Sequence, residues 1–335
     1  MPDAVNPEAL IQTIDLVKSF PVRRGFFGQH KLRLVAVDRV NLIIRKGETL
    51  GLVGESGCGK STLGLTIMQL YEPTSGSVIF DGQDLTQLSG GALQKKRRQM
   101  QMIFQDPLAS LDPRMTVEEI VREPMDIQDV GKGKSRIQEV SRLLQVTGMP
   151  TDAAMRFPTE FSGGQQQRIG IARALALQPK LMICDEPVSS LDVSVQAQIL
   201  NLLRDLQEQF EITYLFISHN IAVTAFMSRR IGVMYLGQLV EVGPSKNIVS
   251  NPLHPYTIAL INAVPEPEPK TDQPTRSLSG DVPSPIDRPS GCPFHPRCPL
   301  AKERCIHEPP VMRELAPDHM VACHFAENVD MIRSR

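Results

Sequence analysis

The first 70 residues carry the hydrophobic pattern of short strands followed by one helix. Leu32–Val37 and Val40–Ile44 are rich in β-branched and aliphatic residues, which predicts strands in the region from about residue 10 to 55. Thr49–Val53 is a compact apolar run typical of a buried strand, and Ser61–Leu70 has the spacing of a helix. This segment is therefore predicted to be mainly β-structure that leads into a helix.

Helix and strand patterns alternate through the next part of the chain. Apolar residues recur at helical spacing in a central segment of about residues 108–160, for example in Ile137–Val146. The pattern then predicts a helix over 165–177, a buried strand over Leu181–Cys184, a helix over Val193–Gln209 and a buried strand over Thr213–Ile217. Such alternation is the signature of an α/β fold with a mostly parallel sheet covered on both faces.

The composition changes after about Val264. Seven prolines fall between Pro265 and Pro289, which predicts an extended linker over 265–290. A small Cys- and Pro-rich module follows over 291–335. We therefore predict one large domain over 1–264, a linker and a C-terminal module.

The overall charge argues against nucleic acid as a partner. The chain of 335 residues has a net charge of −1, with 41% hydrophobic and 22% charged residues, whereas a dedicated nucleic-acid binder usually has a strong basic excess. Its one dense basic run, Lys95–Arg98, is interpreted as a solvated helix face.

The targeting and cysteine signals favour a cytosolic protein, or one held at a membrane by a partner. No stretch approaches the ~20 apolar residues that a spanning helix needs, and Met1–Leu10 lacks the features of a signal peptide. Six cysteines in such a chain are not expected to form structural disulfides. Two of them, Cys58 and Cys184, are isolated, and the other four cluster near the C-terminus.

A phosphate-binding loop follows the predicted strand Thr49–Val53. Gly54-Glu55-Ser56-Gly57-Cys58-Gly59-Lys60-Ser61 fits G-x-x-x-x-G-K-[ST] and opens a helix that continues with Thr62, the context that this motif requires. Lys60 is expected to reach the β- and γ-phosphates of ATP and Ser61 to coordinate Mg²⁺. The residues from Gly54 to Thr62 are assigned to ATP binding. We also expect Lys60 and the helix N-terminus to stabilise the thiolate of Cys58.

Two further motifs narrow the class. The apolar strand Leu181-Met182-Ile183-Cys184 ends in two carboxylates, where Asp185 is placed to hold the Mg²⁺ shell and Glu186 to polarise the attacking water. Ser162-Gly163-Gly164-Gln165 opens the helix 165–177 and makes a second anion-binding helix N-terminus. One P-loop and one further phosphate-binding helix start suggest that two protomers share nucleotides.

These motifs resemble those of the ABC transporter ATPase family. The resemblance implies a P-loop ABC ATPase fold with an N-terminal antiparallel β subdomain and a helical subdomain. It also implies that the signature Ser162–Gln165 closes over ATP held by the P-loop of a partner subunit. The same resemblance implies roles for four more residues. Gln105 would sense Mg²⁺ and nucleotide and touch the permease, and Asp192 would belong to the loop that crosses the dimer interface. His219 would contact the γ-phosphate, and the ring of Phe20 would stack on adenine.

The sequence departs from the family pattern at two positions. Phe161 replaces the usual Leu before the signature, and Asn220 follows His219 where Asp is usual. Neither change removes a group expected to touch phosphate, so the resemblance still implies a catalytically competent ATPase.

Four segments are similar in more detail to the dipeptide/oligopeptide (and nickel) importer ATPases. They are the segments 54–60, 186–196, Asn251-Pro252-Leu253-His254-Pro255-Tyr256-Thr257 and Gly291-Cys292-Pro293-Phe294-His295-Pro296-Arg297-Cys298. The resemblance is to the F-type partner and implies a heterodimer with a homologous ATPase beneath two transmembrane permeases. An extracytoplasmic peptide-binding protein would feed this assembly, and the ATPase would lie peripherally on the cytoplasmic face of the membrane. Peptides are favoured over nickel as the solute.

The four C-terminal cysteines predict a metal-stapled module. Cys292, Cys298, Cys305 and Cys323 are separated by five, six and seventeen residues, unlike the spacing of a zinc ribbon or a ferredoxin. The resemblance implies a [4Fe–4S] cluster, with Zn²⁺ and reduced free thiols as the alternatives. Nearby His295, His307 and His324 are candidate substitute ligands. Because this module is far from the ATP motifs in sequence, a structural or redox-sensing role is expected.

Two other classes of function remain open from the sequence. A soluble ABC ATPase of DNA repair or translation would normally have a long coiled-coil insertion or two cassettes, and this sequence shows neither. An iron–sulfur redox sensor that only binds nucleotide would not need both Glu186 and His219.

Overall fold

The computed structural model describes residues 6–24, 30–263, 281–329 and 331. The chain divides into two compact units, one formed by the described parts of 1–44, 49–86 and 218–335, the other by 45–48 and 87–217. The C-terminal module predicted over 291–335 therefore belongs to the same unit as the P-loop.

A four-stranded sheet in the first unit is the predicted antiparallel β subdomain. Its strands are β1 (Ala9–Arg24), β2 (His30–Arg45), β4 (Ser75–Phe80) and β5 (Gln83–Asp84), in the order β2-β1-β4-β5. Strand β1 is antiparallel to β4, with Ile11 opposite Phe80, and the register shifts between Ile14 and Val17. Both Ile11 and Phe80 are fully buried, so the apolar positions found in the sequence fix this register.

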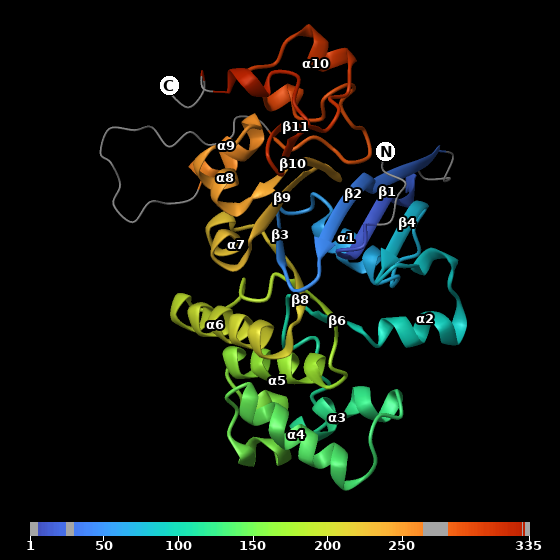
Figure 1. The fold of residues 1–335 in the computed structure, drawn as a ribbon, viewed down its shortest axis with the longest axis vertical. Helices are drawn as coiled ribbons and strands as arrows, with labels where there is room; N and C mark the ends of the chain where they lie inside the picture. Colours follow the sequence, from blue (N-terminus) through green and yellow to red (C-terminus); the bar gives the residue numbers. More distant parts are fainter. Residues whose placement is uncertain (1–5, 25–29, 264–280, 330, 332–335) are drawn as a thin grey trace. The chain divides into compact units, whose positions relative to one another are not determined.

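The C-terminal residues complete the other sheet of the first unit. Its strands are β3 (Thr49–Val53), β9 (Arg230–Tyr235), β10 (Gln238–Pro244), β11 (Arg313–Ala316) and β12 (His319–Val321), in the order β11-β12-β10-β9-β3. Strand β3 is parallel to β9, and β12 is antiparallel to β10. The helices of this unit are α1 (Lys60–Ile67), α7 (Ile221–Met227), α8 (Ser245–Ser250), α9 (Pro255–Asn262) and α10 (Glu303–His307) (Figure 1).

The cysteine-rich residues share their core with this sheet. Cys292, Phe294 and Cys305 are buried in one cluster with Val53 of β3 and Tyr235 of β9. Burying a side chain such as Phe294 contributes about 1.5–3 kcal/mol. The module therefore draws its hydrophobic stabilisation from the sheet that leads into the P-loop.

The second unit combines a parallel sheet with helices. Strands β6 (Met100–Ile103), β7 (Leu181–Asp185) and β8 (Thr213–Ser218) are parallel in the order β8-β7-β6. The strands predicted over 181–184 and 213–217 are confirmed as β7 and β8. The helices are α2 (Gly90–Arg97), α3 (Val117–Ile127), α4 (Lys134–Val146), α5 (Gly163–Leu175) and α6 (Val193–Phe210), and Figure 1 shows α3, α4 and α5 packed together.

Two sequence-based expectations lie partly outside the described residues. Residues 265–280 of the linker predicted over 265–290, and residues 1–5 of the segment 1–10 considered as a leader, are outside the described ranges. Within those ranges, no helix combines the length and apolarity that a membrane span requires.

Candidate active site

The P-loop lies between β3 and α1, as the sequence predicts. Gly57 and Gly59 have φ angles of 77° and 107°, a region that favours glycine. A Cβ atom on Gly59 would also overlap the carbonyl oxygen of Ala36. These glycines let the backbone curl tightly before α1, so that its N–H groups and the helix N-terminus form an anion-binding concavity.

Lys60 lies inside this curled loop. Its side chain is among the buried polar groups, and its Nζ donates to the carbonyl oxygens of Gly54 at 2.8 Å and Glu55 at 3.0 Å. Ser61 is exposed, whereas Thr62 is half-buried and its carbonyl oxygen accepts a bond from Thr66 at 2.7 Å. The ammonium group is thus held within the loop, the position from which it can contact phosphate oxygens.

The expectation of a stabilised thiolate at Cys58 is wrong. Cys58 is 5% exposed, and this burial raises the pKa of its thiol. Lys60 Nζ lies 3.8 Å from the sulfur and acts to lower the pKa, but exclusion of water outweighs it. The thiol is therefore protonated at neutral pH, and Cys58 serves as a small apolar group in the loop.

Phe20 is part of an aromatic pair that sequence reasoning missed. Its ring meets Tyr71 edge-on, with the ring centroids 5.3 Å apart, and Tyr71 is 39% exposed. The ammonium group of Lys18 lies 5.0 Å from the Phe20 centroid and 5.6 Å from that of Tyr71. Both rings are accessible in part, as an adenine-stacking role for Phe20 requires.

The end of β7 brings two predicted site residues together. Nε2 of Gln105 donates to Oε2 of Glu186 at 3.2 Å. Asp185 is the last residue of β7 and is buried, and Glu186 follows with a φ of 46°. A non-glycine residue in this left-handed region costs of order 1 kcal/mol or more and often occurs at functional sites. The backbone N–H of Glu186 donates to the carbonyl oxygen of Ile217 at 2.9 Å, which continues the pairing of β7 with β8.

The signature Ser162–Gln165 forms the N-terminus of α5 as a capping box. Ser162 is the N-cap, its hydroxyl accepts from the backbone N–H of Gln165 at 3.4 Å, and the Gln165 side chain accepts from the Ser162 N–H at 3.0 Å. Phe161, the first departure from the family pattern, is buried with its ring 4.4 Å from the Arg156 guanidinium. The larger residue is therefore packed beneath the signature without disturbing the cap.

The remaining two predicted contacts lie at helix starts. Asp192 is exposed at the N-cap of α6, and His219 is exposed directly after β8. Asn220, the second departure, caps α7 because its Oδ1 accepts from the N–H groups of Ala222 at 2.9 Å and Val223 at 3.3 Å. An amide oxygen thus serves as the cap that a carboxylate would otherwise provide.

The four C-terminal cysteines are free thiols close enough to influence one another. Burial, followed by the neighbouring thiols of the set, raises the pKa of Cys292 to about 11 and that of Cys298 to about 12. Within the described part of the chain, however, no group of three or more His, Cys, Asp or Glu side chains is arranged to hold a metal ion. The donors are thus of the right kind, but the structure does not show the predicted metal site.

Two of the three candidate substitute histidines, His295 and His324, bond to backbone. A ring nitrogen of His295 lies 3.0 Å from the Cys292 carbonyl oxygen, and one of His324 lies 2.9 Å from that of Glu308. Surface hydrogen bonding accounts for both side chains.

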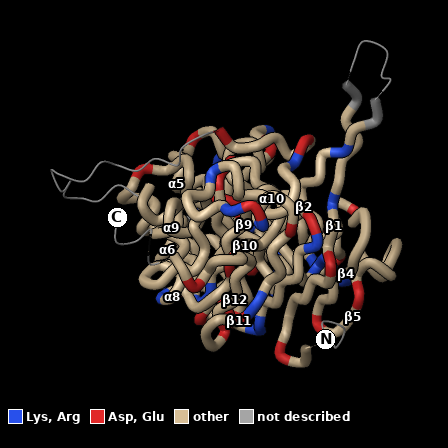
Figure 2. The backbone as a smooth tube through the Cα atoms, turned by 90° about the horizontal axis from the view of Figure 1, so that it is seen from above, with Lys and Arg blue, Asp and Glu red and all other residues tan. Residues whose placement is uncertain are grey.

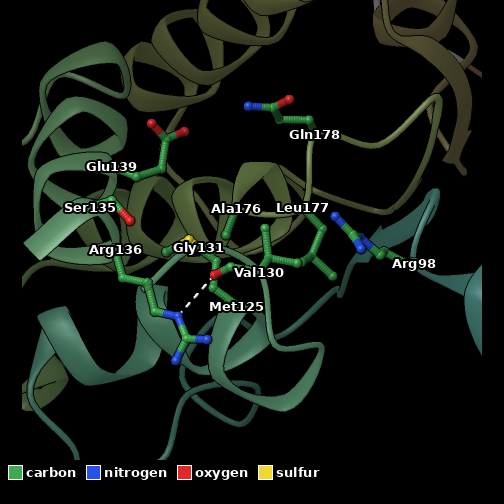
Figure 3. Close-up of a pocket in the computed structure, with 10 residues that line it drawn as sticks. All are labelled: Arg98, Met125, Val130, Gly131, Ser135, Arg136, Glu139, Ala176, Leu177 and Gln178. Carbon is green, nitrogen blue, oxygen red and sulfur yellow. Dashed lines mark hydrogen bonds between the residues drawn. The ribbon is translucent and has the colours of Figure 1, made fainter. Parts of the chain in front are cut away.

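A small cavity in the second unit is distinct in its lining from these motifs. It measures about 230 Å³, and Figure 3 shows Nε of Arg136 pointing to the Val130 carbonyl oxygen, to which it donates at 2.8 Å. The ten lining residues are Arg98, Met125, Val130, Gly131, Ser135, Arg136, Glu139, Ala176, Leu177 and Gln178. None is a predicted ATP-site residue.

Two contacts to the P-loop come from motifs that the sequence left without a role. Glu55 forms an ion pair with Arg297, 242 residues away in sequence, and its backbone N–H donates to Oη of Tyr256 at 2.8 Å. Although the C-terminal module is far from the ATP motifs in sequence, Arg297 of this module contacts the P-loop directly.

A strand, a glycine-rich loop with an enclosed lysine, and an acidic pair at the end of a second strand define a P-loop ATPase. Comparison with known proteins narrows this class. The family described as "ABC transporter" matches residues 37–189, and the one described as "Oligopeptide/dipeptide transporter, C-terminal region" matches 240–305.

Individual relatives match nearly the whole chain. The oligopeptide transport ATP-binding protein AppF of Bacillus subtilis is 49% identical over 325 residues, covering 96% of this chain and 99% of that protein. The putative oligopeptide transport ATP-binding protein YkfD of the same organism is 47% identical, covering 96% and 98%. A dimeric structure of the ATP-binding cassette MJ0796 in a post-hydrolysis state with ADP and Pi is similar, with a TM-score of 0.63 and 30% identity, covering 70% of this chain and 98% of that one. The chain belongs to the ABC transporter ATP-binding proteins of the oligopeptide/dipeptide transporter family.

Proposed function

We propose that this protein hydrolyses ATP to power the import of di- or oligopeptides. The observation that carries the proposal is the match to oligopeptide transport ATP-binding proteins along 96% of the chain. That match includes both the ATPase motifs and the C-terminal region, over 37–189 and 240–305.

Each predicted residue has a role in this proposal. The loop Gly54–Thr62 binds the phosphates, with Lys60 on the β- and γ-phosphates, and Phe20 stacks on adenine. Glu186 polarises the attacking water, and the bond from Gln105 orients its carboxylate. His219 contacts the γ-phosphate.

The residues proposed for Mg²⁺ fit that ion. Ser61, Gln105 and Asp185 offer hydroxyl, amide and carboxylate oxygens, the hard ligands that Mg²⁺ takes. When bound, the ion neutralises negative charge on the phosphates during transfer.

The proposal includes partners. ATP held by a second ATPase subunit, homologous to this chain but not identical to it, is contacted by five residues of this chain: Ser162, Gly163, Gly164, Gln165 and Asp192. The ATPase pair lies peripherally on the cytoplasmic face of the membrane and drives two transmembrane permeases, and an extracytoplasmic peptide-binding protein delivers the solute. The dimeric cassette MJ0796 supports pairing as a property of the fold.

The charge distribution supports protein partners over nucleic acid. The chain has 36 Lys and Arg against 37 Asp and Glu, and Figure 2 shows basic and acidic positions interspersed along the backbone. No strong basic excess favours phosphate-backbone binding.

Two substitutions in the assembled transporter test the proposed binding and hydrolysis of ATP. Glu186→Gln removes the general base and leaves the phosphate loop intact, so ATP binding should persist while hydrolysis falls by about 100-fold or more. Lys60→Ala should instead weaken binding itself, by about 100-fold. ATP turnover and nucleotide binding are measured on the same preparations. Normal turnover by the Glu186→Gln complex would contradict the role of Glu186.

The solute is tested by uptake into vesicles that contain the two permeases and both ATPases, with the peptide-binding protein supplied as well. Labelled di- and tripeptides should accumulate in an ATP-dependent manner, and Lys60→Ala should abolish this. Uptake of Ni²⁺ without peptide uptake would reject peptide import while leaving the ATPase assignment in place.

We also propose that Cys292, Cys298, Cys305 and Cys323 hold one [4Fe–4S] cluster, with Zn²⁺ as the alternative. The packing of Cys292, Cys298 and Cys305 in one core cluster supports this, as does the bond at 2.8 Å from the Cys292 N–H to the Cys305 carbonyl oxygen. The bound cluster would supply a structural or redox-sensing link between segments of the module.

The cluster is tested by iron and zinc analysis of anaerobically purified protein. Wild-type protein should be brown and lose its iron on Cys298→Ser, whereas Cys58→Ser should retain the wild-type iron content. One zinc per colourless chain would reject iron–sulfur. Four freely titratable thiols in a metal-free native protein would reject both metals.

A further inference from the structure

Two motifs from the last third of the chain grip one residue of the P-loop. Nη1 and Nη2 of Arg297 donate to the two carboxylate oxygens of Glu55, at 2.8 Å and 2.9 Å. Oη of Tyr256 accepts from the Glu55 backbone N–H at 2.8 Å. Both the carboxylate and the backbone of Glu55 are thus fixed by residues about 200 or more positions away in sequence. We call these contacts the Glu55 clamp.

The clamp is shielded by aromatic rings. The Arg297 side chain is 5% exposed and that of Glu55 is 23% exposed. Tyr235 packs against Tyr256 with ring centroids 4.7 Å apart and against Phe294 at 5.3 Å. The Arg297 guanidinium lies 5.9 Å from the Tyr235 centroid. A two-pronged, charge-assisted pair in such a shielded setting is geometrically specific, and removing one member leaves a poorly solvated charge.

The clamp acts on the groups that the P-loop uses. The Glu55 carbonyl oxygen accepts from Lys60 Nζ at 3.0 Å, so the clamped residue also touches the lysine. The Glu55 carboxylate is a negative charge within a loop that is proposed to bind a triphosphate. Pairing with Arg297 offsets that charge, and the bond to Tyr256 fixes the direction of the Glu55 peptide.

A second C-terminal contact supports the same loop from behind. Nη1 of Arg288 donates to Oδ2 of Asp38 at 2.6 Å, and Nη2 donates to the Leu236 carbonyl oxygen. The next residue, Gly237, donates its N–H to the Cys58 carbonyl oxygen at 2.8 Å. The C-terminal segment thus reaches the loop through the turn between β9 and β10 as well as through Glu55.

We infer that Arg297 and Tyr256 are positioning residues for the P-loop, and that through Glu55 the C-terminal region sets the affinity for ATP. This inference rests on the proposed binding of ATP by this loop. It assigns a task to the two motifs, around Tyr256 and Arg297, that ATPase chemistry alone leaves unexplained. A role confined to fold stability would alter unfolding without changing nucleotide affinity in the folded protein.

The test is calorimetric binding of a non-hydrolysable Mg–ATP analogue to the full-length chain. Arg297→Gln should weaken binding by about tenfold, because the Glu55 charge then faces the phosphates unpaired. Arg297→Lys, which keeps the charge but loses the two-pronged geometry, should fall between this variant and wild type. The decisive variant is Glu55→Gln/Arg297→Gln, which removes both charges and should bind the analogue more tightly than Arg297→Gln alone.

Two further readouts separate positioning from stability. The loss caused by Arg297→Gln should be greater for the ATP analogue than for ADP, because repulsion by Glu55 grows with phosphate charge. In the assembled transporter the KM for ATP should rise while kcat stays within about twofold. Tyr256→Phe removes a single oxygen and should also weaken binding of the ATP analogue. If Arg297→Gln does not fold, the affinity of Tyr256→Phe tests the positioning role instead.

Controls keep this inference distinct from the proposed function. Arg304→Gln breaks another ion pair of the module, with Glu308 at 2.6 Å on the surface, and should bind ATP like wild type. If wild type binds ATP and Lys60→Ala does not, the proposed loop function holds. Wild-type affinity in both Arg297→Gln and Tyr256→Phe would then overturn the clamp alone.

Discussion

The P-loop and the signature Ser162–Gln165 each lead into a helix N-terminus, but these two helix starts are supported in opposite ways. The start of α5 is capped by its own residues, because Ser162 and Gln165 bond to each other three positions apart. The P-loop is supported by residues that are distant in sequence, because Tyr256 and Arg297 bond to Glu55. The same anion-binding element can therefore be built locally or assembled from remote segments.

This difference bears on how each site responds to change. A self-capped helix start loses only its own few bonds when one residue is replaced. A loop held by the C-terminal region is sensitive to residues that never approach nucleotide. Four substitutions or measurements separate the two kinds of support.

The largest effect is expected from the buried carboxylate that organises the C-terminal side of the first unit. Glu241 is fully buried and accepts from the N–H groups of Leu253 at 2.7 Å and His254 at 3.0 Å, and pairs with His319 at 2.7 Å. Glu241→Ala leaves two buried groups, on His254 and His319, and the half-buried N–H of Leu253 without their acceptor, so urea unfolding should show a loss of about 3 kcal/mol. Glu314→Ala, on an exposed carboxylate, is the control. A loss below about 1 kcal/mol for Glu241→Ala would show that this remote support is dispensable.

A smaller effect is expected from a matched glycine pair in the signature. A Cβ on Gly164 would overlap Cγ1 of Val195 in α6, whereas one on Gly163 would make ordinary contact with Leu191 at 3.4 Å. Gly164→Ala should therefore cost about 2 kcal/mol of stability through overpacking, and Gly163→Ala less than about 1 kcal/mol. Thermal unfolding of the two variants side by side measures this. Equal melting temperatures would mean that α5 and α6 separate at little cost.

The cap itself should have a modest effect. Ser162→Ala removes the hydroxyl that accepts from Gln165, and should lower the free energy of unfolding by about 1 kcal/mol. Ser162→Asp offers another side-chain acceptor and should restore most of this loss. If Ser162→Asp does not restore stability, the contribution of Ser162 to stability does not come from capping α5.

The smallest effect concerns Cys58 and pH. Burial raises the pKa of this thiol in the folded chain, so the unfolded chain releases the proton first as pH rises. The contribution of this residue to stability is thus fully present below the unfolded pKa and declines as pH rises through it toward the folded pKa. Cys58→Ser should flatten the alkaline slope of stability relative to wild type. Fast modification of native Cys58 by a thiol reagent at pH 7 would contradict its burial.

Local patterns made most of the site predictable. The strand, loop and helix around Lys60 follow from a contiguous motif, and the capping box at Ser162 follows from two residues three apart. Strand β7 and the acidic residue Asp185 at its end could be predicted equally well, because the apolar run and the residue that ends it are adjacent in sequence.

Contacts between distant residues could not be read in the same way. Nothing in the spacing of Tyr256 or Arg297 indicates that both meet Glu55, since each contact depends on how the sheet order brings chain ends together. The pKa of Cys58 was misjudged for a related reason. The sequence shows its charged neighbour Lys60, but burial is a property of the folded chain.

The pairing of β12 with β10 has a consequence for synthesis of the chain. Strand β10 is formed by Gln238–Pro244, with Leu239, Val240 and Val242 buried. Its partner β12, at His319–Val321, emerges from the ribosome about 75 residues later. Until then β10 is an uncovered apolar edge, the kind of strand that recruits other chains into aggregates. Nascent chains stalled before residue 319 should therefore depend on chaperones far more than completed ones.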